Sequence, residues 1–396
     1  MAYLDHAATT SMSPASSAAL IAELGQLGNP SSLHEAGRRA RRIVEESREQ
    51  IAAALGARPG EVVFTAGGTE ADNLALKGLY WSRSAADPRR RRILVSAVEH
   101  HAVLDTAHWL ADHEGAELVL LPVDGIGRVQ LAQVRELLSV APADVALLSC
   151  MWANNEVGTM QPIAELAELC REFGIPFHSD AVQAVGQVPV EFRSGISALT
   201  LSGHKLGGPV GIGALVVGRD VGLTPVLHGG GQERNVRSGT LATATIAGLA
   251  AAIGEAVDQM AARAAHLSNL RDLLVGQVLR VVPDAVLNGD PVLTSAARLP
   301  NNAHFSFSGC EGDALLLLLD AQGVQCSTGS ACSAGVPQPS HVLLAMGVDS
   351  VQARGSLRFS LGMTSTQLDI AELVAALPGA VDRARRAGVS TVGRTA

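Results

Sequence analysis

Residues 61–81 read EVVFTAGGTEADNLALKGLYW, and the fold class follows from this stretch. It begins with an apolar run, EVVFTA, that is typical of a buried strand, and it ends in an amphipathic helical pattern. Two glycines join the two parts and allow a tight turn. A strand that leads through a turn into a helix is the repeating unit of α/β domains. The stretch therefore predicts a sheet covered by helices if the unit recurs along the chain.

The unit recurs up to residue 218. Six further apolar runs are predicted as buried strands: RILVSAV (92–98), AELVLLPV (116–123), VALLSC (145–150), IPFHSD (175–180), ALTLSG (198–203) and GIGALVVG (211–218). Amphipathic stretches such as IAELAELCREFG (163–174) lie between several of them. Buried strands that alternate with helices predict a mostly parallel sheet. We expect an α/β fold with a seven-stranded sheet.

A second region follows the predicted sheet. A long helix, roughly residues 242–277, is expected to lead into it. There NAHFSFSG (302–309) and SLRFSLG (356–362) are predicted strands, and GDALLLLLDAQG (312–323) is a predicted helix. We expect a smaller α+β domain formed by residues 1–15 and 256–396, beside a large domain of residues 16–255.

Composition narrows the class of protein. The 396 residues are 47% hydrophobic and 17% charged, with a net charge of −8. These values fit a compact enzyme and argue against direct nucleic-acid binding. The start MAYLDHAATT lacks the basic and apolar regions of a signal peptide, and no apolar run approaches the roughly 20 residues that cross a bilayer. We expect a cytoplasmic protein that does not contact membranes.

Five cysteines stand at positions 150, 170, 310, 326 and 332, with no C-x-x-C spacing. A disulfide framework or a metal site is therefore not expected. Cys150 and Cys170 lie in apolar patterns and are expected in the core. Cys326 and Cys332 lie in CSTGSACSAG (326–335), whose glycines and serines favour a loop near the surface. Either both are incidental small residues, or one is a thiol on a flexible arm.

Polar residues follow three of the predicted strands, at the sheet edge where ligands of open α/β sheets collect. GGTEADN (67–73) places Thr69 at a helix start that suits a phosphate, although a simply capped helix fits as well. Asp180 is predicted either as a buried carboxylate or as a helix N-cap. Lys205 follows a strand and precedes glycines. A lysine held among apolar strands deprotonates readily and forms Schiff bases.

These three features fit one cofactor, pyridoxal 5'-phosphate. It requires a carboxylate at its ring nitrogen, a lysine at its aldehyde and a cup for its phosphate. His100 follows another strand, where an imidazole is placed to stack on the ring and to handle protons. A structural role for this histidine is the alternative. As a set, the residues favour the cofactor over the separate structural interpretations.

With these motifs in place, the chain resembles the cysteine desulfurases of the NifS/IscS type (group I), within the class V aminotransferase family of fold-type I pyridoxal-phosphate enzymes. The matching motifs occur in family order over most of the chain: YLDHAATT (3–10), GNPSSLH (28–34), GGTEADN (67–73), EHHAVLD (99–105), NNEVG (154–158), HSDAVQAVG (178–186), LSGHKLGGPVGIGAL (201–215), HGGGQERNVRSGT (228–240), STGSACSAG (327–335) and LRFSLG (357–362).

The resemblance implies cofactor-binding roles for the matched residues. Lys205 forms a Schiff base with pyridoxal 5'-phosphate and later moves the Cα proton of the substrate. Asp180 pairs with the ring nitrogen, Gln183 hydrogen-bonds the ring hydroxyl and His100 stacks on the ring. The other implied contacts are made by Asn155 to the cofactor and substrate, and around the phosphate by Gly68, Thr69, Ser202 and His204.

The resemblance also implies how the substrate L-cysteine is handled. Arg358 takes its carboxylate in a bidentate contact, assisted by Asn29. Cys332 is the implied nucleophile: its thiolate attacks the substrate sulfur, which leaves a persulfide on the protein and L-alanine as product. Thr240 reaches the phosphate of the neighbouring subunit, which implies a homodimer. A Gly/Ser-rich segment suits a sulfur that moves between a buried site and an acceptor.

Several points stay open in the sequence. An iron–sulfur scaffold and a tRNA-thiolation enzyme are the implied sulfur acceptors. Cys326 is expected to be a packed thiol, with a second sulfur carrier as the alternative. Val210 stands where the family often has lysine, and the longer tail that some relatives use to dock a scaffold is not found after LRFSLG. The alternative functions are a selenocysteine lyase, another class V aminotransferase or lyase, and a non-catalytic sulfur-relay protein.

Overall fold

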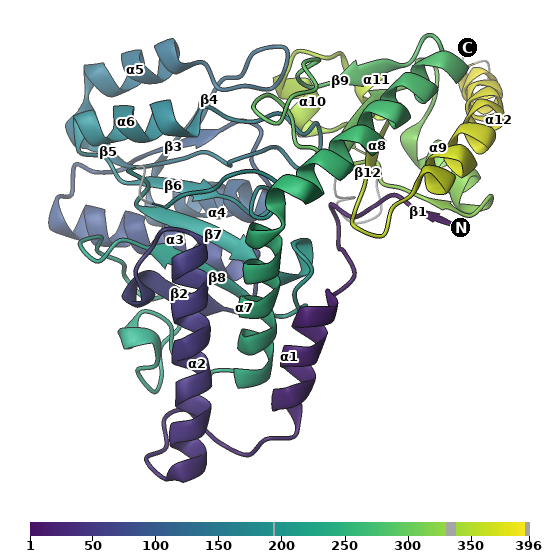
Figure 1. The fold of residues 1–396 in the computed structure, drawn as a ribbon. Coiled ribbons are helices and arrows are strands. Elements are labelled where there is room, and N and C mark those ends of the chain that lie inside the picture. Colours follow the sequence, from purple (N-terminus) through teal and green to yellow (C-terminus); the bar gives the residue numbers. More distant parts are fainter. Residues whose placement is uncertain (193–194, 330–337, 393–396) are drawn as a thin grey trace.

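The structure is a computed structural model that describes residues 1–192, 195–329 and 338–392. Figure 1 shows a larger unit built on a central sheet and a smaller unit that carries both ends of the chain. A long helix, α8 (Met260–Val281), runs from the larger unit into the smaller one. None of the helices in these described ranges is both long and apolar enough to span a membrane.

The sheet of the larger unit confirms the predicted α/β fold. It contains seven strands in the order β2 (Val62–Thr65), β8 (Gly213–Val217), β7 (Ala198–Ser202), β6 (Phe177–Asp180), β5 (Val145–Ser149), β3 (Arg92–Ser96) and β4 (Glu117–Leu121). Strand β8 is antiparallel to both its neighbours, and the other pairings are parallel. Each of the seven predicted apolar runs therefore forms a strand of this sheet.

Helices cover both faces of the sheet, which is why its strands are apolar on both sides. One face packs against α3 (Gly68–Ala86) and α4 (His101–Glu114). The other face packs against helices α2 (Glu35–Ala54), α5 (Leu131–Val140), α6 (Ile163–Phe173) and α7 (Thr243–Asp258). Helix α1 (Pro14–Leu24) lies against α7 (Figure 1). Four short 3₁₀ turns join these elements: η1 (Pro59–Glu61), η2 (Pro142–Asp144), η3 (Gly203–Lys205) and η4 (Glu233–Asn235).

The prediction of one long helix at 242–277 is wrong, because the chain breaks at Gln259. This residue has φ −96° and ψ 3°, and α7 ends before it while α8 begins after it. Ile253 of α7 belongs to the core of the larger unit, whereas Leu267 and Leu274 of α8 belong to the core of the smaller one. Two apolar faces that serve different cores require a change in helix direction, which a local periodicity does not reveal.

The smaller unit has the predicted α+β character. Its antiparallel sheet has the order β12 (Ser356–Ser360), β10 (Asn302–Ser306), β9 (Val286–Asn288), and β1 (Ala2–Tyr3) lies parallel to β11 (Val324–Gln325). Helices α9 (Gly312–Asp320) and α12 (Gln367–Val392) pack on these strands. The short helices α10 (His341–Ala345) and α11 (Ser350–Arg354) instead place residues such as Val342 and Ala353 in the core of the larger unit. The domain limits near residues 15 and 255 stay a prediction.

Cysteine burial follows the sequence expectation. Cys150 and Cys170 are fully buried in the core of the larger unit, as predicted. Cys326 is 8% exposed and belongs to the core of the smaller unit, which supports a packed thiol. Burial raises the pKa of the Cys326 thiol to about 12. Cys332 lies outside the described residues.

Candidate active site

A cavity of about 410 Å³ opens where the carboxyl ends of β5, β6 and β7 meet the smaller unit. Chain segments 7–8 and 327–329 contribute to its wall. The structure brings together around this cavity ten of the residues predicted from sequence: Gly68, Thr69, His100, Asn155, Asp180, Gln183, Ser202, His204, Lys205 and Arg358. They come from separate segments that meet because parallel strands end at one edge of the sheet.

Lys205 follows β7 on the turn η3 and points into the cavity wall formed by the N-terminal segment. Its Nζ donates to the backbone oxygens of Ala7 at 2.7 Å and Ala8 at 2.8 Å. Burial, together with the nearby Arg358 charge, lowers the Lys205 pKa to about 8. An amine with this pKa is partly neutral near physiological pH and is available as a nucleophile.

Lysine is rare in this chain, and this was a signal that the motif analysis left unused. The sequence contains two lysines among 30 basic residues of the Lys/Arg type. The other, Lys77, places its Nζ over the ring of Trp109, 4.2 Å from the centroid. Of the two lysines, only Lys205 lines the cavity.

Asp180 ends β6 at the floor of the cavity. Its Oδ1 accepts a hydrogen bond from Val182 N at 2.9 Å, and burial raises the pKa of the carboxyl to about 6. A second carboxyl, Asp72, is 1% exposed and also lines the cavity. Burial first, and then the Asp180 charge, raise the Asp72 pKa well above its usual value. The pair therefore carries less negative charge than two free carboxylates.

His178 lies in β6 beside Asp72, beneath the cavity. Its Nε2 is 3.5 Å from Asp72 Oδ1 and 3.0 Å from Thr200 Oγ1, and its Nδ1 is 2.9 Å from Ser149 Oγ. Burial lowers the His178 pKa to about 3, so the imidazole is neutral in the folded protein. These contacts join Ser149, Thr200, His178 and Asp72 in one buried polar cluster beside the cavity.

His100 is the N-cap residue of α4. Its Nδ1 accepts from Ala102 N at 3.1 Å, which assigns the ring proton to Nε2. Burial, with a contribution from the Lys205 charge, lowers the His100 pKa to about 4. The ring is therefore neutral at physiological pH and offers an N–H donor at its other nitrogen.

The start of α3 is suited to bind an anion at one end of the cavity. The N-cap Gly67 supplies no side-chain cap, so the first backbone N–H groups of the helix are left for another acceptor. A Cβ at Gly68 would lie 3.1 Å from Val182 Cγ2 and 3.4 Å from Ser202 Cβ. Only glycine therefore leaves full room between the helix start and the strands. His204, on η3, completes this part of the wall.

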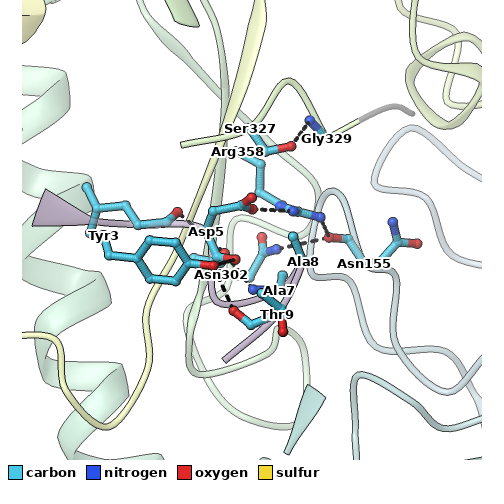
Figure 2. A network of polar contacts seen from close by, with 12 residues as sticks. Tyr3, Asp5, Ala7, Ala8, Thr9, Asn155, Asn302, Ser327, Gly329 and Arg358 are labelled. Carbon is cyan, nitrogen blue, oxygen red and sulfur yellow. Dashed lines mark hydrogen bonds and ion pairs between the residues drawn. The ribbon is translucent and has the colours of Figure 1, made fainter. Parts of the chain in front are cut away.

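Arg358, from β12, closes the opposite end of the cavity. Its side chain is 5% exposed, and its Nη2 donates to Asp5 Oδ1 at 2.7 Å. Nη1 donates to the backbone oxygen of Asn155 at 2.9 Å. Figure 2 shows the guanidinium held between the N-terminal segment and the loop that carries Asn155. Gln183 joins the same segment, because its Nε2 donates to Ala7 O at 3.0 Å.

The segments on either side of residues 330–337 are both fixed to the cavity wall. On one side, Arg358 N donates to Ser327 O at 2.7 Å. On the other side, Ser340 Oγ donates to Glu156 Oε2 at 2.5 Å, and the carbonyl of Glu99 lies 2.9 Å from His341 Nε2. The residues that flank the predicted nucleophile therefore lie at the cavity, although Cys332 itself is outside the described range.

Two predicted residues do not reach the cavity within one chain. Asn29 is exposed in the loop before α2, and its Oδ1 accepts from Ser31 N at 2.9 Å. Thr240 is exposed beyond η4. The structure of one chain does not bring Asn29 to Arg358, because the α1–α2 loop runs along the outer side of the larger unit (Figure 1).

Sequence reasoning assigned no role to several residues of the site. Asp72 and Glu156 are buried and line the cavity, His178 is fully buried beside Asp72, and Asp5 is half-buried and contacts Arg358. All four stand inside motifs quoted above, so the three acidic residues among apolar neighbours were an available signal. The contacts that these residues make could not be predicted from the sequence, because each partner is distant in the chain.

The chain is similar to known proteins over most of its length. Residues 2–373 match the family described as Aminotransferase class-V. An IscS-like cysteine desulfurase from Mycobacterium tuberculosis (strain ATCC 25618 / H37Rv) is 58% identical over 396 residues, which cover 99% of each chain. A cysteine desulfurase IscS from Dictyoglomus turgidum is 44% identical and covers 93% of this chain and 91% of its own.

A solved structure titled as a NifS-like protein superposes with a TM-score of 0.86 at 32% sequence identity. The match covers 96% of this chain and 100% of the other. The two structures therefore share the same overall fold.

Proposed function

The chain belongs to the class V aminotransferase family as a pyridoxal-phosphate-dependent cysteine desulfurase of the IscS/NifS type, and we propose that its cavity converts L-cysteine to L-alanine while the sulfur passes to Cys332. One observation carries the proposal: Lys205, Asp180, His100 and Arg358 line a single cavity. The relatives do not favour a selenocysteine lyase or another class V reaction. Retention of this residue set argues against a non-catalytic relay protein.

The donor set of the cavity fits the cofactor. When bound, pyridoxal 5'-phosphate supplies a carbonyl carbon that takes an amino group and a conjugated ring that accepts electron density. Asp180 is a buried carboxylate with a raised pKa, and a positive ring nitrogen is the partner that stabilises its charged form. The uncapped start of α3, with Ser202 and His204, suits the phosphate.

Lys205 and His100 are the groups that we expect to transfer protons to and from the substrate. Lys205 would hold the cofactor through its amine and, once free, would act as the base at the substrate Cα, for which a pKa of about 8 is well matched. His100, neutral with its proton on Nε2, lines the same cavity and could donate that proton to a bound group. Gln183 and Asn155 orient the bound groups from the two sides of the cavity.

Arg358 receives the carboxylate of L-cysteine. Two of the five N–H donors of its guanidinium are used by Asp5 and Asn155, which leaves three for a ligand. The amino acid is thereby held by its carboxylate at one end and by its amino group at the other. We expect its side-chain sulfur to lie toward the segment whose flanking residues, Ser327 and His341, line the cavity.

The sulfur transfer balances as an exchange between two thiols. The Cys332 thiolate attacks the sulfur of the bound substrate, an S–S bond forms and the Cβ–S bond of the substrate breaks. The Cβ carbon is reduced and gains a proton, which yields L-alanine, and Cys332 is oxidised to a persulfide. The net change is L-cysteine plus Cys332–SH giving L-alanine plus Cys332–S–SH.

The assembly and partners are further parts of the proposal. We place Thr240 and Asn29 in the active site of a second copy of the chain, because both are exposed and lie outside the cavity of their own chain. A homodimer with shared sites follows. The persulfide is expected to pass to an iron–sulfur scaffold or a tRNA-thiolation enzyme in the cytoplasm, and the buried, unpaired thiols at Cys150, Cys170, Cys310 and Cys326 support a reducing setting.

Alanine release from L-cysteine, with reductant present, tests the proposal. The wild-type holoenzyme is expected to release alanine, and Cys332→Ala is expected to retain the cofactor but release none. Equal release by both proteins would show that Cys332 is not the sulfur acceptor. If neither protein releases alanine, a selenocysteine substrate takes the place of L-cysteine.

A further inference from the structure

Asp5 holds the guanidinium of Arg358 from the side of the N-terminal segment (Figure 2). Arg358 Nη2 lies 2.7 Å from Asp5 Oδ1, and Nη1 lies 2.9 Å from the backbone oxygen of Asn155. The side chain of Arg358 is 5% exposed and that of Asp5 is 22% exposed. Two acceptors in different directions fix a planar group in its plane, so the guanidinium cannot rotate freely.

The backbone fixes Asp5 as firmly as a strand residue. Ser360 N donates to Leu4 O at 2.8 Å, and His6 N donates to Ser360 O at 3.3 Å, so residues 4–6 bridge the edge of β12. Leu4 is fully buried in the core of the smaller unit. Because side chains alternate along an extended segment, burial of Leu4 turns Asp5 to the opposite face. Asp5 pairs with Ser360, which lies on the same face of β12 as Arg358.

The same segment contacts other residues of the site. Ala7 O accepts hydrogen bonds from Lys205 Nζ at 2.7 Å and from Gln183 Nε2 at 3.0 Å. Tyr3 Oη donates to Thr9 O at 2.9 Å and so closes the segment on itself. Residues 3–9 therefore hold Arg358 at a fixed place relative to Lys205.

The guanidinium keeps donors for a ligand. Within the described parts of the chain, Arg358 Nε has no hydrogen-bond partner, and Nη1 and Nη2 each have a second N–H. A carboxylate bound in a bidentate contact needs two donors that lie in one plane. The orientation of that plane is set by Asp5 and by the Asn155 carbonyl.

We propose that Asp5 is a positioning residue that orients the Arg358 guanidinium and thereby sets the affinity of the site for the α-carboxylate of its amino-acid substrate. The proposal rests on the function proposed above, in which Arg358 binds that carboxylate. Asp5 acts through Arg358 and takes no part in bond making. Since the carboxylate is bound equally in the ground state and the transition state, loss of Asp5 raises KM and leaves kcat nearly unchanged.

The experiment replaces Asp5 with asparagine in the holoenzyme. Asp5→Asn keeps the size of the side chain and one acceptor oxygen but removes the charge. The measurements are KM and kcat for L-cysteine, the Kd for L-alanine by calorimetry, the cofactor absorbance and Tm. KM and Kd are each expected to rise about tenfold, which corresponds to a loss of about 1.4 kcal/mol in binding free energy. The values of kcat and of the cofactor absorbance should stay near those of the wild type. Asp284→Asn, in the exposed Arg385–Asp284 pair of the same unit, is the matched control and leaves every value unchanged.

Wild-type values of KM and Kd in Asp5→Asn overturn the proposal. A parallel loss of kcat, cofactor absorbance and Tm also overturns it, because that pattern shows a purely structural residue. If Asp5→Asn does not fold, Asp5→Glu is the variant that tests the proposal. It keeps the negative charge but moves it by one methylene, so KM and Kd should rise if Asp5 orients Arg358. Unchanged KM and Kd in Asp5→Glu would contradict the proposal. The L-alanine measurement needs no turnover, so it remains informative even if the wild type releases no alanine from L-cysteine.

Discussion

Arg48 and Glu233, 185 residues apart in the sequence, form a buried bidentate ion pair at the edge of the larger unit. The two N–O distances are 2.9 and 2.7 Å, and the side chains are 6% and 1% exposed. Glu233 Oε2 also accepts from Phe64 N at 2.9 Å. Glu233, Arg234 and Asn235 have φ values of 47°, 56° and 63°, a left-handed run that costs energy in residues other than glycine. The ion pair therefore holds a strained turn that leads to Thr240.

Arg48→Met is expected to lower the free energy of unfolding by about 3–5 kcal/mol, because it leaves the Glu233 carboxylate buried without its partner. Chemical denaturation of the purified protein measures the change. Arg171→Met, which removes one member of an exposed ion pair with Glu168, serves as the control. It should lower the free energy of unfolding much less than Arg48→Met does. A loss in Arg48→Met no greater than in the control would show that the buried pair does not stabilise the turn.

Lys205→Ala is expected to lower the rate of alanine release by about 10²–10⁴-fold, the usual contribution of a positioned acid–base group. Because the chain contains only two lysines, the lysine that binds the cofactor can be identified directly. Borohydride reduction of the wild-type holoenzyme, followed by peptide mass spectrometry, should add the cofactor mass to Lys205. Lys77→Ala is the matched control and should keep full activity, since its amine packs over Trp109 outside the cavity. Cofactor mass on the Lys77 peptide would refute the assignment.

Cys326→Ala is expected to change the rate of alanine release by less than about threefold, which corresponds to about 0.6 kcal/mol in activation free energy. Burial raises the Cys326 pKa to about 12, so at pH 8 only about one thiol in 10⁴ is the reactive thiolate. Comparison of Cys326→Ala with Cys332→Ala under single-turnover conditions separates the two cysteines. Equal loss in both variants would make Cys326 a second sulfur carrier, the alternative that its burial disfavours.

His304 gives the protein a predictable response to acid. Burial first, then the Arg358 and Arg298 charges, lower its pKa to about 3, well below the usual value of 6.5. Between these two pH values the unfolded chain binds the additional proton. The stability contributed by the neutral imidazole is therefore fully present above pH 6.5 and is lost as the pH falls toward 3, at about 1.4 kcal/mol per pH unit.

His304→Asn should remove this contribution. At pH 5 the wild type is expected to take up about one more proton on unfolding than the variant, and the rise in pH of a weakly buffered solution on unfolding measures this uptake directly. Asn288, whose Nδ2 lies 3.0 Å from His304 Nδ1, keeps a polar partner in the variant. Identical proton uptake by both proteins would mean that His304 titrates alike in the folded and unfolded states.

Much of the fold was predictable from local patterns. The seven apolar runs became the seven strands of the large sheet, because strands buried on both faces are apolar along their whole length. Positions such as Asp180 and Lys205 were predictable as site residues, since Asp180 ends a strand, Lys205 lies on the short turn after the next strand, and strand ends converge at one edge. The break at Gln259 was not predictable, because both helices continue the same local periodicity.

The sequence by itself determined the α/β class and the placing of Thr69, Asp180 and Lys205 near strand ends, since these depend on residue type and on position relative to a strand. The other cavity residues, Arg358 among them, were implied by the family resemblance. The tertiary structure alone decided that residues 3–9 cross the site, that Asp5 meets Arg358, and that Asn29 and Thr240 stay outside the cavity of their own chain. These relationships depend on backbone bridges between segments more than 300 residues apart, such as Asp5 with Ser360. Bridges of that kind form only when the two ends of the chain meet in the folded smaller unit, and no periodicity within a single segment encodes them.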